Sequence, residues 1–260
     1  MNHLNNKTVL ITGATSGIGR SCAKFFASEG ANLVLLARRE NLLLEVKDEL
    51  SKITSGDIYT AQCDITDYQK VRQAVASVPA HLREIDILVN NAGLAKGLEP
   101  LADGLPENWN VTIDTNVKGL LYVTKEVVKG MINRNSGHII NIGSTAGHDV
   151  YPNGSVYCAS KYAVKAITQS LRVELVATDI RVTTIDPGLV ETNFSNVRFN
   201  GDTERAKNVY KGIAPLTPDD VADAVLYAAT RPPHVSINEL ILTPVNQANS
   251  NFVHKVKAEQ

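Results

Sequence analysis

Tyr157 and Lys161 are the residues whose types and spacing most directly suggest chemistry. They stand four positions apart in a helical stretch, so their side chains share one face of the expected helix. A tyrosine hydroxyl has a pKa near ~10 and is a poor base at neutral pH, but a nearby ammonium group favours the phenolate and lowers that pKa. Such a tyrosine can remove the hydroxyl proton of an alcohol as hydride leaves its carbon, or protonate a carbonyl in reverse. Taken alone, the same spacing is more often an accidental pair on a helix.

Two further polar residues would complete such a site. Ser144 ends a predicted strand, where its hydroxyl could bond a substrate oxygen and the charge that develops on it. Asn116 lies within a predicted helix, although a short amide side chain is a poor helix former. A serine at a strand end is usually only a turn residue, so its assignment depends on the other members of the group. Cys158 adjoins Tyr157 but faces another side of the helix, and we assign it no chemistry.

A glycine-rich loop follows the first predicted strand and precedes a helix. Gly13 permits a tight turn, Gly17 lets the backbone approach a pyrophosphate, and Gly19 lets the helix pack closely on the strand. The exposed amides and the helix dipole then favour phosphate groups. Glycines also punctuate ordinary turns, and the spacing is G-x-x-x-G-x-G rather than G-x-G-x-x-G, so the position between strand and helix carries the argument. We predict a dinucleotide site here that comprises Gly13, Thr15, Ser16, Gly17, Ile18 and Gly19.

The end of the second predicted strand indicates which dinucleotide binds. A cofactor without a 2′-phosphate is usually held by a carboxylate at this position, and Ala37 offers none. Arg38 offers a guanidinium group, whose planar fork suits a phosphate. One charged hydrogen bond of this kind contributes about 1.5–3 kcal/mol, roughly a ten- to hundredfold preference. We therefore predict that the cofactor is NADP (NADPH) and that Arg38 binds its 2′-phosphate. Arg39 and Ser16 are the next candidates for this contact. The alternative is that both arginines merely solvate the start of a helix.

The composition argues against several other classes of function. The chain has 260 residues, 43% hydrophobic and 20% charged, which is ordinary for a globular protein that buries a large core. Its net charge of −1 provides no basic field for nucleic acid or an anionic membrane. No apolar run approaches the ~20 residues that span a bilayer, and we see no signal peptide. Cys22, Cys63 and Cys158 are scattered singly, which argues against disulfides or a zinc site. We expect a cytoplasmic protein without a metal.

Alternating short apolar stretches and longer amphipathic ones must position these residues. The apolar stretches are rich in Val, Ile and Leu, which suits parallel strands covered on both faces. Such repeats indicate a doubly wound α/β fold, a parallel sheet of about seven strands with helices on both faces and ligands at the carboxyl ends of the strands. We expect Asp67 and Ser155 to cap helices and Gly30 to follow one. The strands that we place are 7–12, 32–37, 57–63, 85–90, 138–142 and 180–185, and the helices are 18–29, 40–52, 67–77, 107–133 and 155–178.

The joint pattern resembles the classical short-chain dehydrogenases/reductases over nearly the whole chain. The resemblance is carried, in chain order, by Thr12–Gly19, Asn90-Asn91-Ala92-Gly93, Asn116, Ser144, Tyr157-x-x-x-Lys161 and Pro187-Gly188. It implies one Rossmann-fold domain over residues 1–260 and a homo-oligomer, commonly a tetramer. It also implies that Asn116, Ser144, Tyr157 and Lys161 are catalytic, with Asn116 holding Lys161 through water.

The same resemblance implies further contacts with the cofactor. Lys161 would also bind the nicotinamide ribose hydroxyls, and Asp64, which Ile65 follows, would contact the adenine. Capping the next helix is an open alternative for Asp64. The remaining implied contacts are Asn91, Ala92 and Gly93 along the adenosine ribose, and Pro187, Gly188, Val190 and Thr192 at the nicotinamide carboxamide.

The substrate is harder to predict. The stretches 141–147, 194–199 and 216–238 resemble the branch of the family that oxidises 3-hydroxy acids, among them L-serine and L-allo-threonine, 3-hydroxybutyrate or 3-hydroxyisobutyrate, with NADP. Segment 191–218 is long, polar and interrupted, which is typical of a mobile lid carrying a short helix. The resemblance suggests that Arg198 on this lid holds the substrate carboxylate bidentately, so the predicted substrate contacts are Ser144, Tyr157 and Arg198.

Three alternatives stay open at this stage. Arg198 could instead be a solvated loop arginine. The same catalytic group would serve a general carbonyl reductase acting on uncharged ketones, diketones or aldehydes. A regulatory protein that binds the cofactor without turnover is a third function, although such a protein could lose Tyr157 or Lys161, and both are present. For the tail after Pro244 we expect order only through packing on another subunit.

Overall fold

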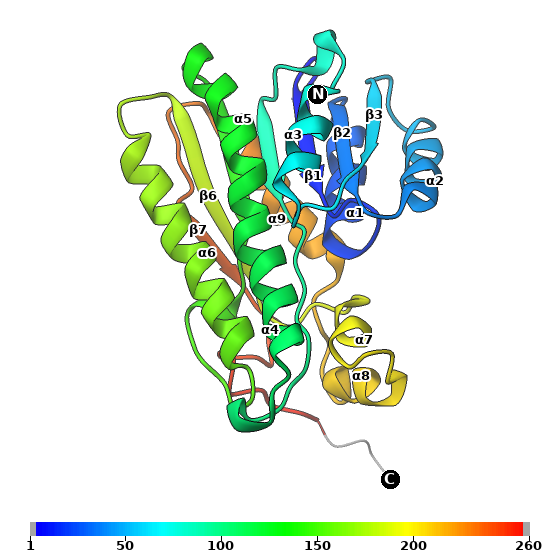
Figure 1. The fold of residues 1–260 in the computed structure, drawn as a ribbon, viewed down its shortest axis with the longest axis vertical. Helices are drawn as coiled ribbons and strands as arrows, with labels where there is room; N and C mark the ends of the chain where they lie inside the picture. The colour runs from blue at the N-terminus through cyan, green and yellow to red at the C-terminus, as the bar shows by residue number, and fades with distance from the viewer. Residues whose placement is uncertain (1–3, 257–260) are drawn as a thin grey trace.

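A parallel sheet forms the centre of the molecule, which is described over residues 4–256 by a computed structural model (Figure 1). Its seven strands are β1 (Thr8–Thr12), β2 (Asn32–Ala37), β3 (Ile58–Gln62), β4 (Ile87–Asn90), β5 (Gly137–Ile142), β6 (Ile180–Pro187) and β7 (Glu239–Leu242). Their order is β3-β2-β1-β4-β5-β6-β7, and every neighbouring pair is parallel. The predicted doubly wound sheet is confirmed, and β7 is the strand that the sequence pattern did not locate.

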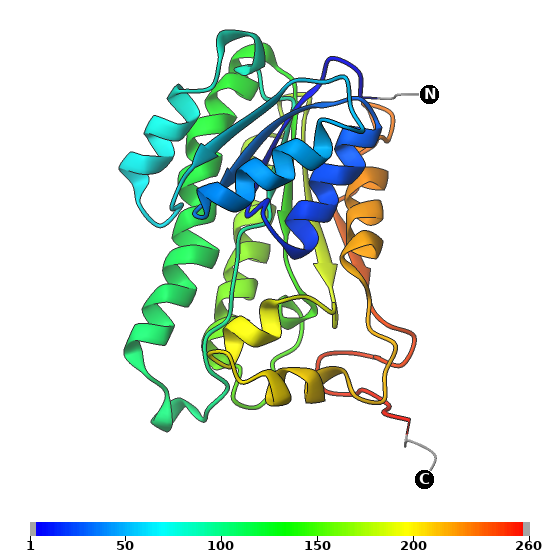
Figure 2. The same ribbon diagram turned by 90° about the vertical axis from the view of Figure 1, so that its right-hand side faces the viewer.

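Two layers of helices cover the two faces of the sheet (Figure 2). Helices α1 (Gly17–Ser28), α2 (Glu40–Leu50) and α9 (Pro218–Ala229) pack on one face, and α3 (Tyr68–Ala76), α5 (Leu120–Arg134) and α6 (Ser155–Glu174) pack on the other. Successive strand residues point to opposite faces, so Ile11 and Leu35 belong to the first core while Leu10 and Leu36 belong to the second. Both faces of the strands therefore need apolar residues, which explains their nearly continuous Val, Ile and Leu content.

Shorter helical segments complete the chain. They are α4 (Pro106–Ile113), α7 (Phe194–Arg198), α8 (Thr203–Tyr210), the π-helical turn η3 (Asp114–Gly119), and the 3₁₀ turns η1 (Ala80–Leu82), η2 (Leu101–Asp103) and η4 (Thr145–Gly147). The single helix predicted over 107–133 is α4, η3 and α5 in direct succession. The predicted lid carries two short helices, α7 and α8, rather than one. In the described part of the chain, no helix combines the length and apolar character needed to cross a membrane.

The helix ends show which local signals were interpreted correctly. Asp67 caps α3 as predicted, because its side chain accepts hydrogen bonds from two backbone amides, and Gly30 follows α1 with a φ of 80°. The prediction for Ser155 was wrong. Gly154 occupies the cap position, where any side chain would collide with the Tyr151 ring, and Ser155 begins the helix. Helix α9 was missed, although Thr217 and its partner Asp220 form a capping box at its start.

All the carboxyl ends of the strands point toward the same side of the molecule, where α7, α8 and the C-terminal tail also lie (Figures 1 and 2). The strand order reverses at β1, which pairs with both β2 and β4. Such a switch point is where doubly wound sheets bind ligands. The described tail is ordered by its own chain: Gln247 is buried and accepts a hydrogen bond from the Leu189 amide at 2.8 Å, and the Val256 amide donates to Gly212. These contacts with its own chain were not expected from the sequence, and packing of the tail on another subunit stays a prediction.

Candidate active site

A cavity of about 580 Å³ opens at the carboxyl ends of the strands and gathers nearly all of the predicted site residues. Its volume lies in the range of small-molecule sites. Arg198 from α7 lines the same cavity as the glycine-rich loop and the catalytic group, so the lid and the sheet enclose one space. The predicted residues that line it are Gly13, Thr15, Ser16, Gly17, Ile18, Arg38, Arg39, Asp64, Ile65, Asn91, Ala92, Gly93, Ser144, Tyr157, Lys161, Pro187, Gly188, Val190, Thr192 and Arg198.

Gly19 and Asn116 are the two predicted site residues that do not line the cavity. A Cβ at Gly19 would collide with the backbone of Gly13, so this glycine serves the close packing of α1. Asn116 is only 2% exposed, and its amide bonds both backbone groups of Leu94 at 2.8 Å and Ser160 Oγ at 3.0 Å. Its side chain is fully engaged, so a water link to Lys161 would have to use the backbone carbonyl of the π-helical turn.

The loop between β1 and α1 is held open by glycine and by the neighbouring strand end. Gly13 and Gly17 have φ values of 68° and 52°, which strongly favour glycine. The Thr12 hydroxyl accepts hydrogen bonds from the amides of Asn91 and Ala92 at 3.1 and 3.0 Å, and the Asn91 side chain donates to the Thr12 carbonyl. These bonds join the ends of β1 and β4, and they give Asn91 a structural contact that the resemblance did not specify.

The two arginines after β2 differ in their contacts. Arg39 Nη2 donates to Thr15 Oγ1 at 3.0 Å and to Ser16 Oγ at 3.3 Å, so its guanidinium lies over the glycine-rich loop. The Arg38 guanidinium makes no hydrogen bond or ion pair within residues 4–256, and it lines the cavity. Arg38 is therefore available to an anionic ligand. Asp64 already accepts hydrogen bonds from the amide and hydroxyl of Thr66, so its carboxylate forms a turn just before α3.

Tyr157, Lys161 and Ser144 come together at the ends of β5 and α6. Lys161 is 7% exposed, and its Nζ lies 5.9 Å from the centre of the Tyr157 ring and donates to the Ile142 carbonyl at 2.8 Å. Burial lowers the pKa of Lys161 to about 8. The Ser144 hydroxyl accepts a hydrogen bond from the Ala146 amide at 3.1 Å, which fixes it at the start of η4. A buried ammonium, a phenol and a hydroxyl thus share one end of the cavity.

The pKa of Tyr157 is raised, mainly because the hydroxyl is removed from water. The neighbouring Tyr151 raises this pKa further, whereas a hydrogen bond with Ser144 and the charge of Arg198 lower it. The prediction that Lys161 lowers the pKa of Tyr157 is therefore wrong when only the side chains of the protein are considered. Desolvation outweighs the positive charges at this distance, and the phenol is the stable form at neutral pH.

Arg198 points into the site rather than into solvent. Its Nη2 donates to Tyr151 Oη at 2.8 Å, and its Nε donates to the Gly97 carbonyl at 3.3 Å. The centre of its guanidinium is 5.5 Å from the centre of the Tyr157 ring, and Phe194 of the same helix packs edge-on against that ring. The alternative of a solvated loop arginine is therefore not what the structure shows. Tyr151 was missed by the sequence analysis, because a tyrosine in a loop carries no local signal of its partner in α7.

Gln247 was missed as well. Its Oε1 bonds the Leu189 amide, and a Cβ at Gly188 would collide with that same oxygen, so the tail shapes the loop after β6. A glutamine near a chain end has no spacing that predicts such a contact. The three cysteines are free and buried. Burial raises the pKa of Cys22 to about 12 and of Cys63 to about 11, so these thiols are poor nucleophiles at neutral pH.

Comparison with known proteins identifies the family of the chain. A sequence profile described as short chain dehydrogenase matches residues 7–202. The chain is 47% identical over 249 residues to the NADP-dependent 3-hydroxy acid dehydrogenase YdfG of Salmonella typhi, covering 95% of this chain and 99% of the relative. It is 43% identical over 245 residues to sulfoacetaldehyde reductase 2 of Chromohalobacter salexigens, covering 94% and 96%.

The solved structures agree with these relatives. The closed form of serine dehydrogenase complexed with NADP⁺ superposes with a TM-score of 0.90 at 46% identity, covering 95% of this chain and 99% of the other. The resemblance that the motifs predicted is confirmed. The chain belongs to the short-chain dehydrogenase family.

Proposed function

We propose that this chain is an NADP-dependent oxidoreductase that moves hydride between NADP(H) and a small 3-hydroxy acid or 3-oxo acid. The observation that carries the proposal is the Arg198 guanidinium, which lies 5.5 Å from the Tyr157 ring in the same cavity and is turned inward by Tyr151. A guanidinium beside the proton-transferring residue suits a substrate whose carboxylate is close to its reacting carbon. The named relatives, a 3-hydroxy acid dehydrogenase and a serine dehydrogenase, support this assignment.

The residues at the β1 and β2 ends fit NADP. Gly13 and Gly17 keep the loop open for a pyrophosphate, Ala37 leaves no carboxylate to repel a 2′-phosphate, and Arg38 is free to bind one. When bound, NADP supplies the carbon that gives or accepts hydride. The other contacts proposed from the family pattern are Asp64, Ile65, Asn91, Ala92, Gly93, Pro187, Gly188, Val190 and Thr192, all of which line the cavity.

The protein groups divide the proton chemistry between them. In reduction, Tyr157 starts as a phenol, as its raised pKa requires, and donates its proton to the carbonyl oxygen. Ser144 donates a hydrogen bond to the same oxygen as negative charge develops. In oxidation, Tyr157 must first lose its proton, and the Ser144 hydroxyl and the Arg198 charge stabilise the phenolate. Asn116 would link Lys161 to water through its backbone.

A steady-state screen tests the assignment. L-Serine, L-allo-threonine, 3-hydroxybutyrate and 3-hydroxyisobutyrate are each oxidised with NADP and with NAD, and a neutral diketone is reduced with NADPH. We expect the highest kcat/KM for a 3-hydroxy acid with NADP. A preference for the neutral diketone would instead favour a general carbonyl reductase. Absence of turnover across a broad carbonyl panel would favour the regulatory protein that binds the cofactor without chemistry.

A second candidate substrate is an anionic aldehyde with a sulfonate in place of the carboxylate. The relative named sulfoacetaldehyde reductase is 43% identical over nearly the whole chain, and a sulfonate offers Arg198 the same bidentate oxygens. Sulfoacetaldehyde, reduced with NADPH, is therefore added to the screen, and a higher kcat/KM for it than for any 3-hydroxy acid would favour the sulfonate.

We further propose that residues 191–218 act as the lid of a single domain, and that the protein is a cytoplasmic homo-oligomer, a tetramer by family resemblance. The free thiols support the compartment. Large apolar side chains are exposed on the outer sides of α5 and α6, including Leu121, Ile132, Tyr162 and Val173, which supports association. Light scattering after size exclusion measures the oligomeric mass, and a monomer at micromolar concentration would contradict this part.

A further inference from the structure

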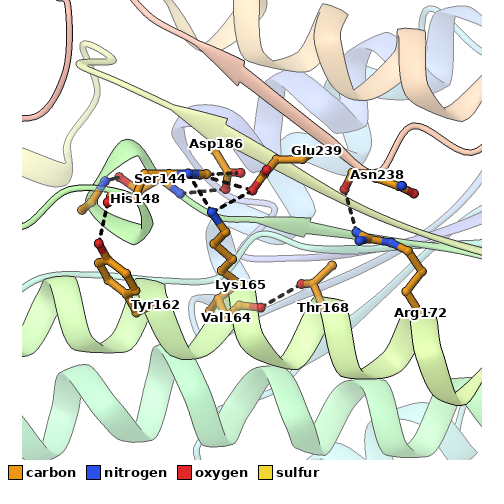
Figure 3. A network of polar contacts seen from close by, with 11 residues as sticks. Ser144, His148, Tyr162, Val164, Lys165, Thr168, Arg172, Asp186, Asn238 and Glu239 are labelled. Atoms are coloured by element: carbon orange, nitrogen blue, oxygen red, sulfur yellow. Dashed lines mark hydrogen bonds and ion pairs between the residues drawn. The ribbon is translucent and has the colours of Figure 1, made fainter.

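Asp186 of β6 is a buried carboxylate that the mechanism above does not use. It is 2% exposed, and it lies directly before Pro187. Its Oδ1 accepts the Ser144 amide at 3.1 Å, and its Oδ2 lies 3.1 Å from His148 Nε2 (Figure 3). Ser144 and His148 flank η4 at its two ends. One carboxylate therefore holds both ends of the short turn that presents Ser144.

Two glycines show how tightly this turn is confined. A Cβ at Gly143 would collide with Asp186 Oδ1, and a Cβ at Gly147 would come within 2.9 Å of the Lys161 carbonyl oxygen. The turn thus packs against Asp186 on one side and against the backbone of α6 at Lys161 on the other. A shift of Asp186 would move Ser144 relative to Tyr157 and Lys161.

Lys165 and Glu239 determine which ring nitrogen of His148 carries the proton that faces Asp186. Lys165 Nζ lies 2.9 Å from His148 Nδ1 and 3.4 Å from Glu239 Oε1, which is also 3.4 Å from His148 Nε2 (Figure 3). An ammonium group can only donate, so Nδ1 accepts and the ring proton is on Nε2, where it faces Asp186. Lys165 therefore places a positive charge near both Asp186 and Glu239, and the His148 Nε2 proton is directed at Asp186.

The same carboxylate lies close to the Lys161 ammonium, because Lys161 Nζ donates to the Ile142 carbonyl at 2.8 Å and the next residue, Gly143, packs against Asp186 Oδ1. Removal from water lowers the pKa of Lys161, and the negative charge of Asp186 raises it. Burial raises the pKa of Asp186, while the hydrogen bond from His148 lowers it. As an anion, Asp186 opposes the desolvation of the Lys161 ammonium. Four charged or titratable groups surround Asp186. They are His148, which follows η4, Lys161 and Lys165 of α6, and Glu239 of β7.

We propose that Asp186 is a positioning residue of this active site: it fixes Ser144 through both ends of η4, and it supplies the buried negative charge that stabilises the Lys161 ammonium. The inference depends on the proposed function only for the catalytic roles of Ser144 and Lys161. It predicts that Asp186 and His148 together determine the position of Ser144, and that Asp186 alone stabilises the charge of Lys161.

The first test compares Asp186→Asn with Asp86→Asn. Asp86 makes the same kind of contacts at the opposite end of the sheet, where it accepts the Thr8 amide and pairs with Lys7, both at 2.9 Å. We expect Asp186→Asn to lower kcat about 100-fold, the cost of a small misplacement of a reacting group, with the KM for NADPH within about twofold of wild type. The high-pH decline of kcat should also move to lower pH. Asp86→Asn should change neither quantity.

A second variant separates geometry from charge. His148→Ala removes one hold on Asp186 and leaves its charge, so kcat should fall about tenfold, less than for the first variant, and the high-pH decline should stay in place. Thermal unfolding and NADPH binding establish that each variant is folded. If Asp186→Asn does not fold, wild-type kcat in His148→Ala overturns the geometric half of the proposal. Loss of kcat in Asp186→Asn without movement of the pH profile overturns the electrostatic half.

A measurement without turnover keeps this proposal distinct from the proposed function. In protein labelled with ¹³C at lysine Cε, the Lys161 signal, assigned with Lys161→Met, should titrate at lower pH in Asp186→Asn than in Asp86→Asn. Equal titration in the two variants overturns the role of Asp186 toward Lys161. If the wild type oxidises no hydroxy acid and reduces no carbonyl, the proposed function fails, whereas this titration still decides the charge effect.

Discussion

The floor of the site and its lid are built in different ways. The floor, residues 137–165, consists of β5, η4 and the start of α6. Its polar residues Asn141, Ser160 and Lys161 are buried and hydrogen-bonded within the protein. The lid, residues 191–218, consists of helices of five and eight residues joined by an exposed turn. It reaches the floor through few contacts, chiefly Arg198 to Tyr151 and Phe194 to Tyr157.

This difference assigns two tasks to two regions. A rigid, buried floor suits a reaction whose geometry must not vary, because a misplaced proton donor loses rate steeply. A lid of short helices can change its residues without disturbing the sheet, which suits the choice of substrate. Under the proposed function, the reaction type would belong to the floor and the selection of an acid would belong to Arg198. Variants that change one task and spare the other test this division.

The largest effect is expected from Tyr157→Phe in the floor. The ring that packs against Phe194 at 5.5 Å is kept, but the group that exchanges the proton is lost. Since general acid–base catalysis contributes about 10²–10⁴-fold, kcat should fall by about three orders of magnitude while NADPH affinity stays unchanged. Stopped-flow oxidation of NADPH and fluorescence titration measure the two quantities. The control is Tyr59→Phe in β3, far from the cavity, which removes a hydroxyl that is hydrogen-bonded to Ser77. A Tyr157→Phe enzyme with more than a tenth of wild-type kcat would refute the assignment.

Arg198→Ala should break the selection of acids and leave the reaction intact. The loss of two charged hydrogen bonds, about 3 kcal/mol together, raises the KM of a 3-hydroxy acid about 100-fold. The kcat/KM for a neutral diketone should change by less than about fivefold, since no carboxylate is involved. Arg205→Ala is the matched control, because Arg205 lies on the same lid with its guanidinium 4.5 Å from the Phe199 ring. Equal losses on both substrates would show that Arg198 supports the lid instead of binding the acid.

Cofactor choice should change at β2 without affecting either region. Ala37→Asp combined with Arg38→Leu places a carboxylate where the ribose hydroxyls would bind and removes the free guanidinium. We expect the ratio of kcat/KM for NADP over NAD to fall ten- to a hundredfold, about one charged hydrogen bond. Arg20→Leu removes a nearby positive charge that pairs with Glu49 and serves as the control. An unchanged ratio in the double variant would indicate that the 2′-phosphate is bound by Arg39 instead of Arg38. The Arg39 guanidinium is hydrogen-bonded to Thr15 and Ser16.

Sequence patterns predicted the floor better than the lid, for a physical reason. The strands, the glycine-rich loop and the Tyr157 to Lys161 spacing are local patterns, because periodicity and backbone conformation are encoded within a few residues. Contacts between distant segments are not encoded in this way. The partner of Arg198 is Tyr151, 47 positions earlier, and neither residue has a neighbour that signals the other. The role of Asp186 could likewise not be predicted, because its contacts with Ser144 and His148 form only when β5 and β6 pair.

The pKa of Tyr157 shows a second limit. The type and spacing of Lys161 suggested a lowered tyrosine pKa, but spacing carries no information on how much water a site excludes. Burial reverses the direction of the shift. A prediction made from charge alone errs wherever desolvation of the same group is larger.

The smallest effect concerns the stability of the floor itself and leaves the chemistry unchanged. His138 of β5 is buried, and burial lowers its pKa from 6.5 to about 3. Between these two values the unfolded chain binds a proton that the folded chain does not, so the free energy of unfolding should fall as pH falls, by about 1 kcal/mol per pH unit for one histidine. Urea unfolding at pH 7 and pH 5 measures this slope, which His138→Gln should reduce and the exposed-site variant His234→Gln should not. If His138→Gln keeps the wild-type slope, the acid sensitivity arises elsewhere, and the buried floor is not the part of the molecule that acid weakens first.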